Sequence, residues 1–301
     1  MNLEERLNSI DNLKVAKNAP MNEQTSFRAG GCADFLVEPA DEAALKEVLQ
    51  VLHGTDVPYM VLGNGSNVLV RDGGYHGVII KIGEAFDYVR QEEQNLLCGA
   101  GTLMSVVARA ATAASLAGFE FASGIPGSIG GAVFMNAGAY DGEIKNILSR
   151  VRVITKDGTQ EKWLTPEDLD MGYRHTALHE TGDVVVQVEL KLQPGNQEEI
   201  REKIADFTNR RNTKQPVAYP SAGSFFKRPE GYFAGKLIQD AGCKGLTVGG
   251  AQVSELHAGF VINIGNATAT DIVQLKELVQ GRVYEKFGVM LEPEVRIIGE
   301  D

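Results

Sequence analysis

The sequence lacks the cysteine pattern of a disulfide-stabilised or zinc-binding protein. Its 301 residues include three cysteines. Cys32, Cys98 and Cys243 are far apart and never form a CxxC pair. The five histidines show no HExxH or other metal-ligand spacing. We therefore expect neither a disulfide framework nor a bound metal.

Long apolar runs and an excess of basic charge are also absent. No apolar run approaches a membrane span, and the N-terminal stretch MNLEERLNSIDNL carries acids where a signal peptide has its apolar core. The formal net charge of −11 argues against general binding to nucleic-acid phosphates. We expect a cytoplasmic protein with no membrane or nucleic-acid partner. Since no strong hydrophobic stripe predicts an obligate dimer, we expect a monomer.

The charge reverses sign in one window of this acidic chain. Residues 207–236 contain six basic residues and only one acid, Glu230. Inside this window lies AGSFFKR, in which Ser224 precedes two aromatic residues and two cations. A serine beside glycine is more often only a turn residue. A hydroxyl walled by rings and flanked by positive charge nevertheless suits an anionic substrate.

Strand and helix signals alternate through the first part of the chain. Residues 33–38 predict a strand, and Asp41 caps a predicted helix that ends at Gly54. A short strand at 59–62 leads into the glycine loop at 63–67. A dinucleotide fingerprint opens a helix, whereas residues 68–71 and 78–80 have strand character. The pattern therefore predicts a strand–loop–strand phosphate cradle and not a Rossmann site.

The remaining elements are predicted from apolar periodicity and turn residues. Predicted strands lie at 86–90, 96–99, 150–155, 159–164, 184–192 and 294–298, with 184–192 alternating as a half-buried strand. Predicted helices begin at the caps Thr102 and Thr165 and lie near 200–207, 233–241 and 271–287. The stretch SGIPGSIGGAVFMNAGAY, 123–140, is rich in small residues. Its backbone can approach a flat or phosphorylated ligand closely, or form a tight helix–strand junction.

Several segments, taken in order, resemble the UDP-N-acetylenolpyruvoylglucosamine reductase family, flavoenzymes of bacterial peptidoglycan synthesis. The matching segments are TSFRAGG at 25–31, GNGSNVLV at 63–70, SGIPGSIGGAVFMNAGAY at 123–140, GYR at 172–174, AGSFFK at 222–227, GGAQVSELHAGFVIN at 249–263 and LEPEVR at 291–296. Each is weak alone, and their joint order is specific.

The resemblance implies an α+β fold with an FAD-binding domain of the p-cresol methylhydroxylase type. On that template the FAD-binding domain covers 1–198, in two lobes at 1–82 and 83–198. A smaller α+β substrate-binding lobe covers 199–286, and a C-terminal strand at 287–301 returns to the flavin. The chain has no insertion between Arg174 and Ser224, so it resembles the shorter subclass, which lacks a tyrosine loop over the UDP. Tyr219 and Tyr232 are candidates to close over it instead.

The family's reaction implies roles for three residues. NADPH reduces non-covalently bound FAD, which then reduces the enolpyruvyl group of UDP-N-acetyl-3-O-(1-carboxyvinyl)-glucosamine to UDP-N-acetylmuramate. Ser224 is implied as the proton donor, with Lys214, Lys227 or a water as a relay. Arg174 is implied to hold the substrate carboxylate. Glu294 is implied as a neutral acid that binds the enolate oxygen.

The resemblance also implies two sets of binding residues. The cofactor-binding candidates are Arg28, Gly63, Asn64, Gly65, Ser66, Asn67, Ser123, Gly124, Ile125, Pro126, Gly127, Ser128, Gly130, Gly131, Asn136 and Gly138. The substrate-binding candidates are Arg211, Lys214, Lys227, Gln252 and His257. A lone histidine such as His257 is more often structural than ligand-binding.

Two other functions remain open from the sequence. One is an FAD-dependent oxidase or dehydrogenase of the same fold that acts on another substrate. The other is a non-catalytic module that binds flavin or a sugar nucleotide. The joint presence of Ser224, Arg174 and Glu294 favours the reductase over both.

Overall fold

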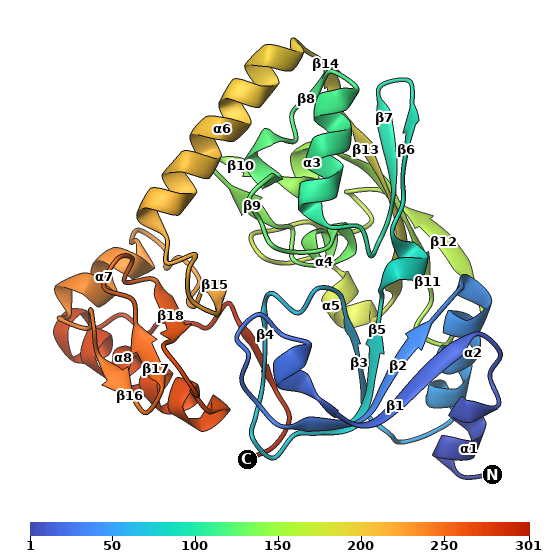
Figure 1. Ribbon diagram of the computed structural model, residues 1–301, viewed down its shortest axis with the longest axis horizontal. Helices are drawn as coiled ribbons and strands as arrows, with labels where there is room; N and C mark the ends of the chain where they lie inside the picture. The colour runs from blue at the N-terminus through green and yellow to red at the C-terminus, as the bar shows by residue number, and fades with distance from the viewer. The chain divides into compact units, whose positions relative to one another are not determined.

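The computed structural model describes all residues, 1–301, as a mixture of helices and strands (Figure 1). Its contacts divide the chain into two compact units, each made of three segments. Unit 1 consists of Met1–Lys17, Phe35–Asn64 and Gly77–Asn209, and unit 2 consists of Asn18–Asp34, Gly65–His76 and Arg210–Asp301. The FAD-binding and substrate-binding domains expected from the sequence are defined by function, so their boundaries stay a prediction. None of the helices has the length and apolar character that a membrane-spanning segment needs.

The first sheet has the strand order β1-β2-β5-β3, with β3 and β5 parallel. Its strands are β1 (Leu13–Pro20), β2 (Cys32–Pro39), β3 (Tyr59–Leu62) and β5 (Tyr75–Lys81), preceded by the short helix α1 (Leu3–Asn8). Helix α2 (Glu42–His53) begins where predicted, because the Asp41 side chain accepts a hydrogen bond from the Ala44 amide at 2.8 Å. Its Leu45, Val48, Leu49 and Leu52 are buried in the core of unit 1.

A five-stranded antiparallel sheet with the order β12-β11-β13-β7-β6 forms the rest of the unit 1 scaffold. Its strands are β6 (Val89–Glu92), β7 (Asn95–Gly99), β11 (Leu148–Ile154), β12 (Glu161–Leu164) and β13 (Val184–Lys191). The expectation of a half-buried 184–192 strand is wrong: β13 is buried from Val184 to Leu190. It is a central strand, and α4 (Ile129–Phe134) packs against it, so both of its faces are covered.

Three local predictions in unit 1 differ from the structure. The expected strand at 86–90 is divided between a 3-10 turn, Glu84–Phe86, and β6. Helix α3 (Met104–Ala113) follows Leu103, because the Thr102 hydroxyl is hydrogen-bonded to the main chain of Tyr88. The Thr165–Asp168 stretch forms a turn in which each side chain bonds the other's backbone amide, and the helix α5 (Leu178–Thr181) comes later.

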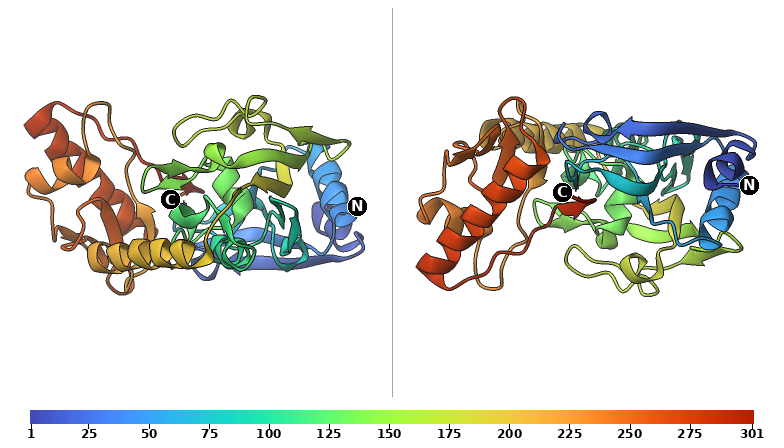
Figure 2. Two further views of the ribbon diagram at one scale, coloured as in Figure 1. Left: turned by 90° about the horizontal axis from the view of Figure 1, so that it is seen from above. Right: turned by 90° about the horizontal axis from the view of Figure 1, so that it is seen from below.

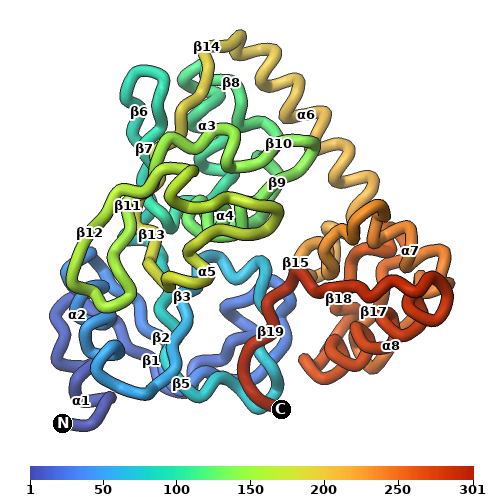
Figure 3. The backbone as a smooth tube through the Cα atoms, turned by 180° about the vertical axis from the view of Figure 1, so that it is seen from behind, coloured from blue at the N-terminus to red at the C-terminus, as the bar shows by residue number.

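Unit 2 is built on a four-stranded sheet with the order β15-β18-β17-β16. Its strands are β15 (Ser221–Ser224), β16 (Thr247–Val248), β17 (Ala251–Val253) and β18 (Phe260–Asn263). Helix α8 (Ala269–Phe287) packs against β16 and β17, and also contacts α7 (Ala234–Asp240) (Figure 2). At the end of the chain, β19 (Arg296–Ile298) lies parallel to β4 (Val68–Val70) (Figure 3).

The long helix α6 (Gln197–Lys214) contains the last residues of unit 1 and the first of unit 2. Only Ile200 of this helix is buried. The remaining small strands of unit 1 are β8 (Leu116–Ala117), β9 (Gly138–Ala139), β10 (Gly142–Glu143) and β14 (Gln193–Pro194). Strands β9 and β10 form a tight antiparallel hairpin, which becomes important for Arg174 below.

Candidate functional site

Ser224 lies at the end of β15, where the backbone leaves the sheet in a fixed direction. It pairs with Phe260 of β18, and the next amide, of Phe225, donates to the Gly259 carbonyl at 2.8 Å. Gly223 has a φ of +77°, a left-handed conformation that favours glycine and interrupts the register of β15. Ser224 itself is exposed, so its hydroxyl is accessible while its backbone is held.

The two aromatic residues after Ser224 do not wall its hydroxyl, and that expectation is wrong. Phe225 and Phe226 are 0% and 3% exposed, and both belong to the core of unit 2. Phe225 packs edge-on against Phe27, with ring centroids 6.1 Å apart. The rings therefore anchor the segment that carries Ser224, since burying two phenylalanines ties this loop to the core.

Glu294 is placed beside the Ser224 segment by backbone pairing. The Glu294 amide donates to the Phe225 carbonyl at 2.8 Å, and the Lys227 amide donates to the Glu292 carbonyl at 2.8 Å. An isolated bridge joins Phe226 and Pro293 between them. Two residues predicted as catalytic, 70 positions apart in the sequence, thus share one backbone ladder within unit 2.

The loop after β3 and the TSFRAGG stretch are tied to the same part of unit 2. The Asn67 side chain donates to the Glu294 carbonyl at 3.1 Å, and the Ser26 amide donates to the Gly65 carbonyl at 3.1 Å. Gly65 has a φ of +64°, and a Cβ there would lie 2.0 Å from the Gln24 carbonyl oxygen. No larger residue fits this turn. Ser66 is half-buried between the two.

Arg28 lies on a loop that is anchored to unit 2 by hydrogen bonds on either side of it. Its backbone is left-handed, with a φ of 53°, and its side chain is exposed. The buried Asn263 side chain donates to the Phe27 carbonyl at 3.1 Å. The Ser26 hydroxyl donates to the Ser221 carbonyl at 2.6 Å, at the start of the strand that carries Ser224.

Asn263 is a residue that the sequence interpretation missed as a support of the site. Its side-chain oxygen accepts hydrogen bonds from the amides of Gly265 and Ala267, while its nitrogen holds the Phe27 carbonyl. A polar residue that ends the buried strand FVIN was the available signal, because buried polar groups are almost always hydrogen-bonded.

In unit 1 the structure brings two of the predicted cofactor-binding loops together. The Asn64 side chain donates to the Pro126 carbonyl at 2.7 Å. A Cβ on Gly63 would lie 2.3 Å from the Ser128 hydroxyl oxygen, so the two stretches are in close contact. Residues 123–127 are half-buried or exposed at this point.

The backbone amides at the start of α4 already have hydrogen-bond acceptors within the protein. The Ile129 and Gly130 amides donate to the carbonyls of Thr102 and Ala100, and the Gly131 amide donates to the Ser128 hydroxyl. A Cβ on Gly130 would lie 2.8 Å from the Ala100 Cβ. Gly130 is therefore packed tightly against Ala100, as in the helix–strand junction that the sequence left as an alternative, whereas Gly131 is exposed.

Arg174 occupies a tight turn in unit 1. Reciprocal backbone bonds between Gly172 and His175 close the turn, and Arg174 has a left-handed φ of 54°. Its guanidinium donates from Nη1 to the Asn136 carbonyl at 3.4 Å and from Nη2 to the Gly138 carbonyl at 3.1 Å. The guanidinium carbon also lies 5.0 Å from the centre of the Tyr173 ring. The turn and the two carbonyls fix the position of the charged group.

The predicted substrate-binding residues all lie in unit 2. Lys227 pairs with Glu292 at 3.5 Å on the surface, whereas Gln252 donates to the Thr247 hydroxyl at 3.1 Å. The Nδ1 atom of His257 accepts the Gly259 amide at 3.1 Å, and burial lowers the pKa of this histidine. This bond gives His257 a structural role in the loop before β18, the strand that pairs with β15 and Ser224. Arg211 and Lys214 lie in the last turn of α6.

Comparisons with known proteins agree on one family. A model of the UDP-N-acetylenolpyruvoylglucosamine reductase C-terminal domain matches residues 215–298, and a model of an FAD binding domain matches residues 33–163. The UDP-N-acetylenolpyruvoylglucosamine reductase of Alkaliphilus oremlandii is 49% identical over 95% of this chain and 94% of its own length. That of Clostridium perfringens is 51% identical over the same shares of both chains.

A solved structure is similar over nearly the whole chain. The crystal structure of UDP-N-acetylenolpyruvylglucosamine reductase from Thermus caldophilus matches with a TM-score of 0.80 and 36% identity. The match covers 95% of this chain and 98% of that one. The expected α+β fold with an FAD-binding domain is confirmed.

Proposed function

The chain belongs to the UDP-N-acetylenolpyruvoylglucosamine reductase family, and from that premise we propose which of its residues carry out the reaction. It is an FAD-containing oxidoreductase of peptidoglycan synthesis that uses NADPH to reduce the enolpyruvyl group of its UDP-sugar substrate. When bound, FAD supplies the hydride-carrying ring that links NADPH oxidation to reduction of the substrate. The reductase is favoured over the other oxidase or dehydrogenase and over the non-catalytic module, since relatives of this family match 95% of the chain and the family's C-terminal domain matches residues 215–298.

The residues at the two glycine loops fit a dinucleotide with a flat ring. Within unit 1, Gly63 and Asn64 lie against Pro126 and Ser128, so two stretches of small residues form one surface. Backbone amides on such a surface suit a pyrophosphate. We assign this role to Gly63 and Asn64 and to residues 123–127, and in unit 2 to Gly65, Ser66 and Asn67 with Arg28 as a cation. Ser128, Gly130 and Gly131 support that surface, because their polar atoms are bonded within the protein.

Arg174 is proposed to bind the substrate carboxylate. Addition of hydride to the enolpyruvyl double bond moves negative charge toward this carboxylate, so a fixed cation lowers the barrier. A planar guanidinium pairs with both carboxylate oxygens, which an ammonium group cannot do. The bonds from Arg174 to the Asn136 and Gly138 carbonyls support this role, because they orient the group before substrate binds.

Ser224 and Glu294 are proposed to act on the carbon and oxygen atoms of the developing anion. Ser224 donates the proton that the neighbouring carbon needs, since the carbanion-like species is far more basic than a hydroxyl. Protonated Glu294 donates a hydrogen bond to the enolate oxygen. The observation that carries this assignment is the ladder from Phe225 to Glu294, which fixes both residues on one rigid element.

The basic window is proposed to bind the substrate diphosphate. Lys227 pairs with Glu292 on the surface, and such an exposed pair contributes little, so a diphosphate can replace the carboxylate. Arg211 and Lys214 add charge from α6, and Gln252 and His257 remain weaker candidates. We also propose that the enzyme works as a monomer in the cytoplasm, which sedimentation and cell fractionation test.

The test of this assignment separates the two half-reactions of Ser224→Ala under anaerobic conditions. We expect flavin bleaching by NADPH to keep its rate, because Ser224 takes no part in it. Reoxidation by the enolpyruvyl substrate is expected to slow by roughly a hundredfold to ten-thousandfold, the usual contribution of a general acid. Stopped-flow absorbance of the flavin measures both rates. An unchanged reoxidation rate removes Ser224 from the mechanism.

A further inference from the structure

Asn136 is the most completely bonded buried side chain near Arg174. It is 0% exposed, and its nitrogen donates to the Glu143 carboxylate at 2.9 Å and to the Gly172 carbonyl at 2.8 Å. Its oxygen accepts the Lys145 amide at 3.0 Å. The donors and acceptors around it fit only one orientation of the amide. One side chain thus joins three stretches of chain at 136, 143–145 and 172.

The same residue also touches the guanidinium through its main chain. The Asn136 carbonyl accepts from Arg174 Nη1, and the Gly138 carbonyl accepts from Nη2. The Asn136 side chain meanwhile holds Gly172, the first residue of the turn that presents Arg174. Asn136 therefore fixes both the backbone that carries Arg174 and the group at the end of its side chain.

This region stores backbone strain that needs such a support. Left-handed φ values occur at Asn136 (40°), Tyr140 (50°), Asp141 (64°), Asp170 (44°) and Arg174 (54°). Asparagine adopts this conformation readily, whereas tyrosine and arginine adopt it at a cost. Strained residues persist where surrounding contacts determine them, and they gather at functional sites.

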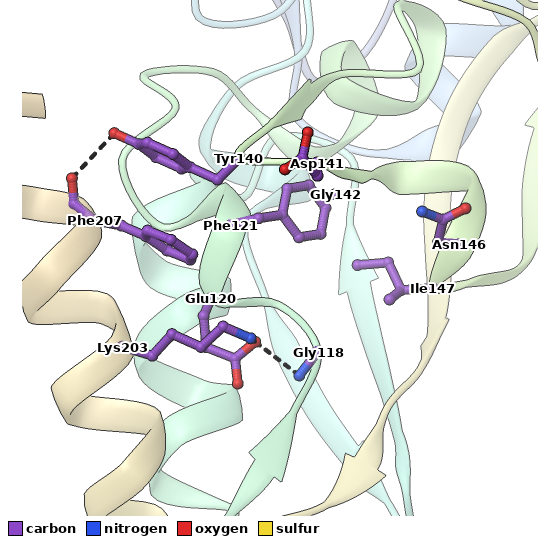
Figure 4. Close-up of a pocket in the computed structure, with 10 residues that line it drawn as sticks. All are labelled: Gly118, Glu120, Phe121, Tyr140, Asp141, Gly142, Asn146, Ile147, Lys203 and Phe207. Carbon is purple, nitrogen blue, oxygen red and sulfur yellow. Dashed lines mark hydrogen bonds and ion pairs between the residues drawn. The ribbon is translucent and has the colours of Figure 1, made fainter. Parts of the chain in front are cut away.

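The far end of the β9–β10 hairpin is held by a different contact. The Tyr140 ring stacks on Phe207 of α6 with centroids 4.3 Å apart, and its hydroxyl donates to the Phe207 carbonyl at 3.1 Å (Figure 4). Beside this stack lies a cavity of about 240 Å³, lined by residues that include Phe121 and Lys203. The stack on Phe207 therefore supports this end of the hairpin, together with Phe121, which lies against Gly142.

We propose that Asn136 is a positioning residue for Arg174, with Glu143 as the acceptor that orients its amide. This inference rests on the proposed role of Arg174 and assigns the Asn136 side chain to the protein instead of to the cofactor. Its removal would leave flavin binding in place and displace the guanidinium. The charged groups near position 136 are Glu143, its partner Lys145 at 3.1 Å, and Arg174. His175, in the same turn, stacks near His179.

The discriminating variant is Asn136→Asp, which keeps the shape and replaces the donor with a second carboxylate. We expect normal FAD content and a rate of flavin reduction by NADPH within about twofold of the parent. Substrate-dependent reoxidation is expected to fall roughly tenfold to a hundredfold at about pH 8, since two acceptors then face the new carboxylate. Part of the loss returns as the pH falls, because a carboxylate beside Glu143 binds a proton more readily. The parent is measured at each pH, and the ratio of variant to parent is the quantity compared.

A compensating variant and a control variant test whether the effect comes from the contact between positions 136 and 143. Glu143→Gln restores a donor opposite a carboxylate at 136, so the double variant is expected to recover much of the reoxidation rate. Asn146→Asp makes the same chemical change at an exposed position of the next turn and is expected to have no effect. Should Asn136→Asp fail to fold, Glu143→Ala at a half-buried position removes the acceptor and is expected to slow reoxidation alone.

Three outcomes distinguish a failure of the inference about Asn136 from a failure of the proposed function. Equal losses in flavin reduction and reoxidation, or loss of FAD, place Asn136 at the cofactor and overturn the inference. No loss in Asn136→Asp or Glu143→Ala, while Arg174→Ala is slow, also overturns it and leaves the proposed function standing. An Arg174→Ala variant with the parent's reoxidation rate contradicts the proposed function itself.

Discussion

At the scale of single residues, the sequence did not reveal how the AGSFFK segment packs. Ser224 is exposed, and Phe225 and Phe226 are core residues that do not surround its hydroxyl. An FF pair can lie either beside a binding site or in the core. The contact of Phe225 with Phe27, which is distant in the sequence, places it in the core. The contacts of Asn136 and Asn263 were equally hidden, because each bonds backbone atoms that the sequence does not place nearby.

Arg174 gives the prediction that belongs to this scale. Arg174→Lys keeps the charge and loses the planar fork and the paired carbonyl contacts, so we expect reoxidation by substrate to slow roughly tenfold to a hundredfold. Arg109→Lys, on the exposed face of α3, serves as the matched control and is expected to match the parent. Equal activity of the two variants would show that Arg174 does not bind the carboxylate.

At the scale of elements, long periodic segments were predicted well and their ends less well. Helix α2 begins at Asp41 as predicted, since its cap is a local bond. Thr102 and Thr165 were equally good candidates by residue type. The first bonds the distant Tyr88 backbone and the second closes a turn, so neither starts a helix. Capping rules describe a local preference that a tertiary partner can override.

Helix α8 shows how a distant residue completes a helix start. Thr268 and Asp271 form a capping box, and the Asp72 carboxylate accepts the amides of Ala269 and Thr270 at 2.9 and 2.7 Å. Asp72 also accepts the Thr270 hydroxyl. The first four amides of α8 therefore all have acceptors, counting the Ile272 amide on the Thr268 carbonyl.

This arrangement predicts a pH-dependent contribution to stability. Burial raises the pKa of Asp72, but the hydrogen bonds from Thr270 and Ala269 outweigh it and lower the pKa below 3.8. The ionised form thus stabilises the folded state above that value, and the stabilisation disappears as the pH falls through the lowered pKa. Asp72→Ala is expected to lose about 1 to 2 kcal/mol at neutral pH.

Urea unfolding of Asp72→Ala and the parent at several pH values measures this difference. We expect the gap in unfolding free energy to be widest near neutrality and to close in strong acid. A gap that is the same at every pH would mean that Asp72 acts by packing and not by its charge.

At the scale of the whole molecule, the sequence predicted the class of fold and the reaction, but not how segments combine. Unit 2 gathers Asn18–Asp34 and Gly65–His76 around the C-terminal part of the chain. No local sequence pattern predicts the hydrogen bond from Asn67 to Glu294 or the pairing of β4 with β19. Such pairings depend on register between segments more than two hundred residues apart, which hydrophobic periodicity does not encode.

With Glu294 in its proposed role, we expect the segment 292–301 to have two separable functions, chemical and architectural. Glu294→Ala leaves every backbone bond of the ladder in place. We expect it to keep FAD and to slow reoxidation roughly a hundredfold to a thousandfold, as for loss of a donor to an oxyanion. Deleting residues 292–301 also removes β19 and the bonds to Phe225, Lys227 and Asn67. We expect that deletion to lower the unfolding midpoint as well.

Flavin content, both half-reaction rates and thermal unfolding of the two variants test this division. Equal thermal stability of the point variant and the deletion would contradict an architectural role for the ladder.

The pairing of Phe225 with Glu294 also has a consequence for synthesis of the protein. A ribosome that has reached residue 290 has already made both glycine loops, Arg174 and Ser224, yet the segment that completes the ladder is still missing. We therefore expect a chain interrupted at residue 290 to be inactive, because it lacks Glu294 and the backbone pairing that places this residue beside Phe225.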